Sequence, residues 1–282
     1  MREVEAWRAE LARWAADDAR VLAACEVVGE TGSTQDVARE RFALRGEFGA
    51  VTALRQTAGR GRLGRVWADT GADGVAITLA IPDRDAESLV LLAAVATCRA
   101  VEGAVKGAVE EAAGWPEGLA RLGIKWPNDI VLRGRKLGGI LIERPVAPRP
   151  LALVGVGINV AQRGFDPSLA VTATSLAIEG VSVTRLAIVL RLLAECERLL
   201  PLDERGLRAE LLPEYLSRDA LRGATASFTT PEGEVAGRVV EAHPFDGIAL
   251  DVEGGVRRLS TATTAVRWWT PPTLGDLSHP TP

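Results

Sequence analysis

The stretch LGIKWPNDIVLRGRKLGGILIE, residues 122–143, decides how the chain folds. It consists of apolar runs separated by a polar RGR turn, a pattern typical of strands joined by tight turns. The following segment PLALVGVGINV, at 150–160, has the same apolar character. These segments together predict consecutive strands of a buried sheet.

Further strands are expected on both sides of this stretch. AVTALRQ at 50–56 and VAITLAI at 75–81 read as strands that enter and leave a glycine-rich loop. From 220 to 269 the pattern changes to short alternating stretches with turns between them. That change predicts a small all-β module after a domain of mixed composition.

Helical spacing of apolar residues marks the remaining segments. It predicts a short amphipathic helix within 2–20, a helix that starts near Gln35, a long helix over 86–113, and two helices within 184–217 that break near Pro201. Strands and helices in this order indicate an α+β fold.

These elements divide the chain into four expected parts. They are an N-terminal amphipathic helical segment at 1–26, an α+β domain at 27–218, a small β-barrel-like domain at 219–270 and a disordered tail at 271–282.

Composition limits the classes of protein. The chain has 282 residues, 47% of them hydrophobic, and no run of about 18 apolar residues, so we expect a globular protein without a membrane span. Its N-terminus is charged and amphipathic rather than a signal sequence, which favours the cytoplasm. Three scattered cysteines and two histidines, each followed by proline, argue against disulfide frameworks, zinc sites and His-dependent triads.

The basic residues are unevenly distributed between the two types. Of 33 basic residues only three are lysines, namely Lys106, Lys125 and Lys136. In a chain so rich in arginine, a lysine suggests a site that uses a flexible point charge instead of a planar fork. Lys125 and Lys136 lie eleven residues apart within the opening stretch, whereas Lys106 belongs to a helical segment and is expected in solvent.

The loop QTAGRGRLGR, at 56–65, resembles two phosphate-binding patterns. Its glycines fit G-x-G-x-x-G, but a dinucleotide site needs a helix directly afterwards, and here a turn and a strand follow. The outer glycines fit the P-loop spacing, but Arg65 and Val66 stand where that motif needs lysine and a hydroxyl. An RG-rich nucleic-acid tract is a third interpretation, which the net charge of -4 disfavours. An ordinary solvated loop is the fourth.

Four segments now stand together in one order. They are STQ at 33–35, QTAGRGRLGR at 56–65, KWPND…RKLGG at 125–139 and GVGIN at 155–159. In this order and spacing the chain resembles the biotin protein ligases, also called biotin–[acetyl-CoA-carboxylase] ligases, over residues 27–269. The resemblance is to the short form of the family, without an N-terminal DNA-binding domain.

The resemblance implies a fold and a reaction. The fold is a central mixed sheet with helices, like that of class II synthetases, followed by a small SH3-like domain. The reaction uses biotin and MgATP to make biotinyl-5′-AMP and pyrophosphate. A lysine of a biotin carboxyl carrier domain, from acetyl-CoA carboxylase or a related carboxylase, then displaces AMP. We expect no partnership with DNA or a membrane.

Two anions must meet in the first step, so cationic donors are the chemical requirement. Arginine can grip phosphate oxygens bidentately, and a lysine can move between carboxylate and α-phosphate. A glycine-rich loop can close over the reactive adenylate and exclude water.

The resemblance also assigns site residues. Those expected at biotin are Ser33, Thr34, Gln35, Gln56, Arg60, Gly61, Arg62, Lys136, Gly138 and Gly139. Those expected at ATP or the adenylate are Arg60, Arg62, Trp67, Asn128, Lys136 and Asn159. The catalytic residues are expected to be Lys136, Arg62, Arg60 and Asp129, with Asp129 orienting the incoming amine.

Structural alternatives exist for several of these positions. Ser33 and Thr34 could serve only as helix caps. Trp126 is more typical of core packing. Asn159 could support a turn, and the glycine pair at 138–139 could form a bulge.

Two positions depart from the family pattern. Gln35 replaces the usual asparagine, and Leu63 replaces an arginine after the second loop arginine. The competing functions are a lipoate or octanoate ligase of the same general fold and a biotin-sensing regulator. KWPND with GRGRxGR argues against the first, and the retained Lys136 argues against the second.

Overall fold

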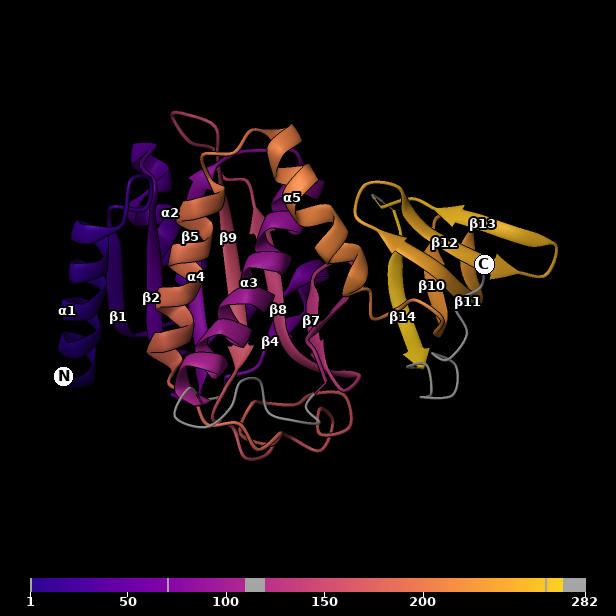
Figure 1. The fold of residues 1–282 in the computed structure, drawn as a ribbon, viewed down its shortest axis with the longest axis horizontal. Coiled ribbons are helices and arrows are strands. Elements are labelled where there is room, and N and C mark those ends of the chain that lie inside the picture. The colour runs from indigo at the N-terminus through magenta and orange to yellow at the C-terminus, as the bar shows by residue number, and fades with distance from the viewer. Residues whose placement is uncertain (1, 70, 110–119, 262, 271–282) are drawn as a thin grey trace.

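The computed structural model describes residues 2–69, 71–109, 120–261 and 263–270. Within them, a seven-stranded sheet forms the centre of the larger domain (Figure 1). Its strands in spatial order are β1 (Cys25–Thr31), β2 (Gly49–Gln56), β5 (Gly74–Pro82), β9 (Leu151–Asn159), β8 (Arg135–Glu143), β7 (Asp129–Leu132) and β6 (Gly123–Lys125). β1 and β2 are parallel and the other neighbours are antiparallel, so the sheet is mixed. The strands predicted within 122–160 are confirmed.

The helices agree with the periodicity of the sequence. They are α1 (Arg2–Asp17), α2 (Thr34–Arg41), α3 (Ala86–Val109), α4 (Arg185–Leu199) and α5 (Glu204–Ser217), with short 3₁₀ turns η1 (Ala43–Arg45) and η2 (Arg62–Gly64). The predicted break near Pro201 is confirmed. The part of the predicted 86–113 helix beyond Val109 lies outside the described residues at 110–119.

Alternation along the strands gives the sheet two different faces. Leu79 and Ala152 point to the main core beneath α3, α4 and α5, which lie side by side on one face (Figure 1). The next residues, Ala80 and Leu153, pack in a separate cluster with Ala38 of α2. α2 therefore covers part of the opposite face, and the rest of that face carries the cleft described below.

Helix α3 has the length and hydropathy of a membrane span over Ala86–Ala108, but 78% of its most apolar stretch is buried in the protein. Its buried residues belong to the main core. The apolar character of α3 thus has a packing explanation, since both the sheet and two helices contact it.

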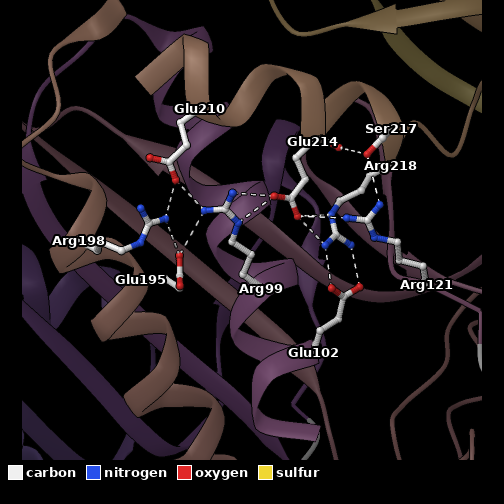
Figure 2. Close-up of polar contacts among 9 residues, drawn as sticks. All are labelled: Arg99, Glu102, Arg121, Glu195, Arg198, Glu210, Glu214, Ser217 and Arg218. Atoms are coloured by element: carbon white, nitrogen blue, oxygen red, sulfur yellow. Dashed lines mark hydrogen bonds and ion pairs between the residues drawn. The ribbon is translucent and has the colours of Figure 1, made fainter. Parts of the chain in front are cut away.

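An arginine–glutamate ladder joins α3, α4, α5 and the segment before β6 (Figure 2). Its members are Arg198, Glu195, Glu210, Arg99, Glu214, Arg218, Glu102 and Arg121. Arg218 is the buried centre, with a side chain only 1% exposed that donates to both carboxylate oxygens of Glu102 at 2.7 Å. Buried charges of this kind are tolerated because every one has a partner.

The C-terminal module is a five-stranded antiparallel sheet. Its strands in spatial order are β13 (Gly255–Leu259), β12 (Gly247–Val252), β11 (Gly233–His243), β10 (Thr225–Thr230) and β14 (Ala265–Thr270). The predicted all-β module is confirmed. The exact domain boundaries remain predictions, and the predicted tail at 271–282 lies outside the described residues.

One side chain of the larger domain belongs to the core of this module. Trp126, 2% exposed, packs with Leu221, Phe228 and Ile248. The core-packing interpretation of Trp126 is therefore correct, but the core that it fills is that of the C-terminal sheet.

Candidate functional site

Small residues at every second position open a cleft on the sheet face beside α2. Ala76 on β5, Gly139 on β8, and Gly155 and Gly157 on β9 line it. The glycines are required by close neighbours, because a Cβ at Gly155 would lie 2.9 Å from Gln35 Nε2 and one at Gly157 would lie 2.7 Å from Trp67 Cε2. The resulting cleft has a volume of about 740 Å³, within the range of pockets that hold small organic ligands.

The side chain of Thr34 orients Gln56 at one end of the cleft. Gln56 Oε1 accepts hydrogen bonds from the Thr34 amide at 2.9 Å and from the Thr34 hydroxyl at 3.1 Å. The hydroxyl also lies 2.8 Å from the Thr78 hydroxyl. Ser33 is the N-cap residue of α2, but its side chain makes no capping hydrogen bond. The interpretation of Ser33 and Thr34 as caps alone is therefore wrong, whereas the predicted helix start near Gln35 is confirmed, because α2 begins at Thr34.

Gln35 presents an unpaired acceptor. Its side chain is buried, and Nε2 donates to the Leu141 carbonyl at 3.0 Å. Oε1 is buried without a hydrogen-bond partner in the described part of the chain. Buried carbonyl oxygens normally have a donor, so a ligand N–H in the cleft could supply one.

The glycine-rich loop forms a small hairpin rather than an irregular lid. β3 (Gly59–Arg60) pairs with β4 (Val66–Trp67), and η2 lies between them. Leu63 has a left-handed backbone (φ 57°) in this turn. Strands β4 and β5 (Gly74–Pro82) follow the loop in the described part of the chain, where a dinucleotide site or a P-loop has a helix, so both phosphate-loop matches are incidental.

The two loop arginines have different partners. Arg60 donates to both oxygens of Asp36 at 2.7 Å, and these hydrogen bonds hold the pKa of Asp36 below its ordinary value. Arg62 donates to Asn128 Oδ1 at 3.2 Å, and Asn128 Nδ2 donates to the Ile140 carbonyl at 2.7 Å. Arg60 thus anchors the hairpin to α2, while the pair of Arg62 and Asn128 closes the hairpin over the cleft.

Two lysines share one carboxylate on the cleft wall. Lys136 Nζ lies 2.6 Å from Asp129 Oδ1, and Lys125 Nζ lies 3.9 Å from Asp129 Oδ2. Each ammonium also faces a tryptophan ring. Lys136 Nζ lies 5.5 Å from the centroid of the Trp67 ring, and Lys125 Nζ lies 5.7 Å from that of the Trp269 ring. The rarity of lysine points to Lys125, but none of the four motifs assigns it a role in the site.

Trp67 lies against the glycine floor, where its ring contacts the backbone positions of Gly139 and Gly157. The predicted packing of Trp67 on adenine remains a prediction. Gly138 does not line the cleft, because it is buried and a Cβ there would lie 2.8 Å from the Gly157 carbonyl. The register of β7 and β8 also shifts beside Gly138, between this residue and Lys136. For this residue the structure favours the bulge over a contact with biotin.

Asn159 has a structural partner as well as a place in the cleft. Its Nδ2 donates to the Thr174 carbonyl at 3.0 Å, and its own carbonyl accepts from the Leu176 amide. Asn159 thus has a structural role, although it lies at the end of β9 rather than in a turn, and it still lines the cleft.

Most predicted site residues meet in this one cleft. Those that line it are Ser33, Thr34, Gln35, Gln56, Arg60, Gly61, Arg62, Trp67, Asn128, Asp129, Lys136, Gly139 and Asn159. Residues 264–269 of the C-terminal module, which the motifs did not suggest, complete its wall. Among the described residues no group of three His, Cys, Asp or Glu side chains could hold a metal ion.

Comparison with known proteins agrees with this geometry. Residues 30–159 match the model of the Biotin/lipoate A/B protein ligase family. The chain is 34% identical to the biotin–[acetyl-CoA-carboxylase] ligase of Mycobacterium tuberculosis over 246 residues, which cover 81% of this chain and 84% of the relative. It is 38% identical to the bifunctional ligase/repressor BirA of Bacillus subtilis over 57% of this chain and 49% of that protein.

The fold is similar to that of solved ligases. The biotin protein ligase of Aquifex aeolicus, in complex with biotin and ATP, superimposes with a TM-score of 0.70 at 24% identity over 86% of this chain and 98% of that one. The ligase of Leishmania major in complex with biotin gives 0.58 at 26% identity over 69% of this chain and 81% of that one.

Proposed function

The chain belongs to the biotin protein ligases, and from this premise we propose that it activates biotin with ATP and transfers it to a carrier lysine. In the first step the biotin carboxylate attacks the α-phosphorus of ATP, which forms biotinyl-5′-AMP and releases pyrophosphate. In the second step a lysine amine of the carrier attacks the acyl carbon, which forms an amide and releases AMP. The relatives' names indicate a biotin carrier of acetyl-CoA carboxylase as the partner.

One observation carries this proposal, namely that the cleft has a neutral amide end and a cationic end. Gln35 and Gln56 provide carboxamides at the first end, with Gln35 Oε1 buried and unpaired. Such groups suit a neutral cyclic urea, which both donates and accepts hydrogen bonds. Arg62 and Lys136 provide the positive charge at the other end, where a carboxylate and a phosphate have to meet.

The residues divide the work between the two steps. Lys136 can leave Asp129 and contact the carboxylate and the α-phosphate as the mixed anhydride forms, and the loss of one such preorganised group typically costs about 10²–10³-fold in rate. Arg62 closes the β3–β4 hairpin through Asn128 and keeps water from the anhydride. Asp129 can orient the incoming amine by accepting a hydrogen bond from it.

The experiment combines two assays on the purified protein. Biotin-dependent exchange of labelled pyrophosphate into ATP reports the first step, and transfer of labelled biotin to a carrier domain reports both steps. Lipoate and octanoate serve as competing acids. Absence of both biotin signals, or preference for lipoate, would contradict the proposal.

We also propose that the protein works in the cytoplasm without DNA or membrane partners. Its three cysteines are free thiols, and burial raises the pKa of Cys98 and of Cys196 to about 12, so these two are unreactive. Free thiols are typical of a reducing compartment. Fractionation of the native host cells by activity tests the location, and filter binding to duplex DNA tests the absence of that partner.

A further inference from the structure

The inference concerns Lys125 and rests on the proposed function. Lys125 lies on β6, and Asp129 begins β7 directly after the intervening turn. The Lys125 side chain is 22% exposed and that of Asp129 is 18% exposed. Lys136 contacts Asp129 Oδ1, so Oδ2 is the oxygen that faces Lys125.

Lys136 has three N–H donors, and it must divide them between Asp129 and the adenylate when both are present. Once its ammonium also contacts the carboxylate and the phosphate, its positive charge is shared among three anionic groups, so the 2.6 Å contact with Asp129 weakens. A half-buried carboxylate that loses its cation is strongly disfavoured. The second step nevertheless needs Asp129 ionised and aimed at the incoming amine.

We propose that Lys125 is a positioning residue that takes over Asp129 when Lys136 engages the adenylate. The distance from Lys125 Nζ to Asp129 Oδ2 is 3.9 Å, so a movement of about 1 Å makes a normal charge-assisted hydrogen bond. The carboxylate then keeps a cationic partner and its direction during the transfer step. Lys125 itself touches neither biotin nor nucleotide in this scheme.

The charges around the pair explain why Lys125 stays back in the free protein. Burial lowers the pKa of Lys125, and repulsion by Lys136 and Arg65 lowers it further, whereas attraction to Asp129 raises it. Arg62 also faces Asp129. When anionic ligand oxygens neutralise Lys136, this repulsion weakens and the attraction between Lys125 and Asp129 grows. The ring of Trp269 keeps the ammonium in place meanwhile.

The test separates the two half-reactions in variants of Lys125. Lys125→Met keeps the stem over Trp269 but removes the charge. We expect it to slow transfer from preformed biotinyl-AMP by about tenfold or more, while pyrophosphate exchange changes less than about threefold. Lys125→Arg should recover most of the transfer rate. Lys106→Met, at an exposed lysine of α3, is the control that should change neither assay.

A double mutant decides whether Lys125 acts through Asp129. If it does, Lys125→Met adds little to the transfer defect of Asp129→Asn, because the group on which it acts is already gone. Additive defects, or equal losses in both half-reactions with no recovery by Lys125→Arg, would overturn the inference even if the methionine variant is less stable. Failure of the wild-type protein to form the adenylate would instead overturn the proposed function.

Discussion

The buried centre of the arginine–glutamate ladder gives a prediction whose size follows from the structure. Arg218→Met removes a guanidinium that donates to Glu102, to Glu214 and to the Leu122 carbonyl. The methionine fills much of the same space but leaves Glu102 without its bidentate partner. Removal of one partner from a buried ion pair typically costs about 3–5 kcal/mol.

The lower end of this range applies here. Glu214 keeps Arg99 at 2.7 Å, so only Glu102 loses its main partner, and we expect a loss of about 3 kcal/mol in the free energy of unfolding. At about 2–4 °C per kcal/mol for a domain of this size, the midpoint of thermal unfolding falls by about 6–12 °C. The other end of the ladder provides the control. Arg198 is 46% exposed, and Arg198→Met should cost at most about 1 kcal/mol.

Both variants are compared by calorimetry and by urea unfolding followed by circular dichroism. Equal midpoints for the two variants, or a fall of less than about 3 °C for Arg218→Met, would refute the reasoning that burial makes this cation essential. A change in the urea m-value would show that the variant had altered the unfolded state instead.

Four further predictions concern the site and the ladder. Lys136→Ala should reduce pyrophosphate exchange by about 10²-fold or more, and a loss of only a few-fold would show that another group activates the carboxylate. Arg62→Gly should release biotinyl-AMP faster, seen as labelling of a bystander protein, and an unchanged dissociation rate would remove its role as a clamp. Gly157→Ala places a Cβ 2.7 Å from the Trp67 ring, which should cost about 1–3 kcal/mol shared between folding and ligand binding, measured by thermal unfolding and biotin titration. Burial raises the pKa of Glu214, but hydrogen bonds from two ladder arginines outweigh this effect, so the pKa lies below its ordinary value of 4.5. The ionised carboxylate therefore stabilises the fold above pH 4.5, and this stabilisation is lost as the pH falls through the lowered pKa. Glu214→Gln should flatten the acid side of the curve of stability against pH, measured by thermal unfolding.

Local pattern was sufficient for most of the fold. β5 (Gly74–Pro82) and α3 (Ala86–Val109) were predictable because long, regular runs of apolar residues are read from the sequence directly. The small residues of the cleft floor, such as Gly155, were visible as a motif, but their purpose depends on neighbours from another strand. Contacts between segments far apart in the chain have no local signal.

The same limit explains the incomplete prediction of the site. The motifs identified Lys136 and Asp129, yet Arg60 is paired with Asp36, a residue outside all four motifs. The rarity of lysine in the sequence points to Lys125, but only the fold shows that it shares the Asp129 carboxylate with Lys136. Trp126 was correctly predicted as a core residue, although no periodicity could indicate which core.

The position of Trp126 determines which residues must be moved together if the C-terminal module is transferred to another protein. By chain order the C-terminal module starts after α5, but its interior includes a side chain that belongs to 125–129, the segment that also carries Asp129. A chimera that exchanges residues 219–270 alone therefore places a foreign cavity around Trp126 and displaces the backbone three residues from Asp129. An engineer who grafts this module must carry the tryptophan and its cavity together, and can in turn use that cavity to adjust the transfer step from outside the active site.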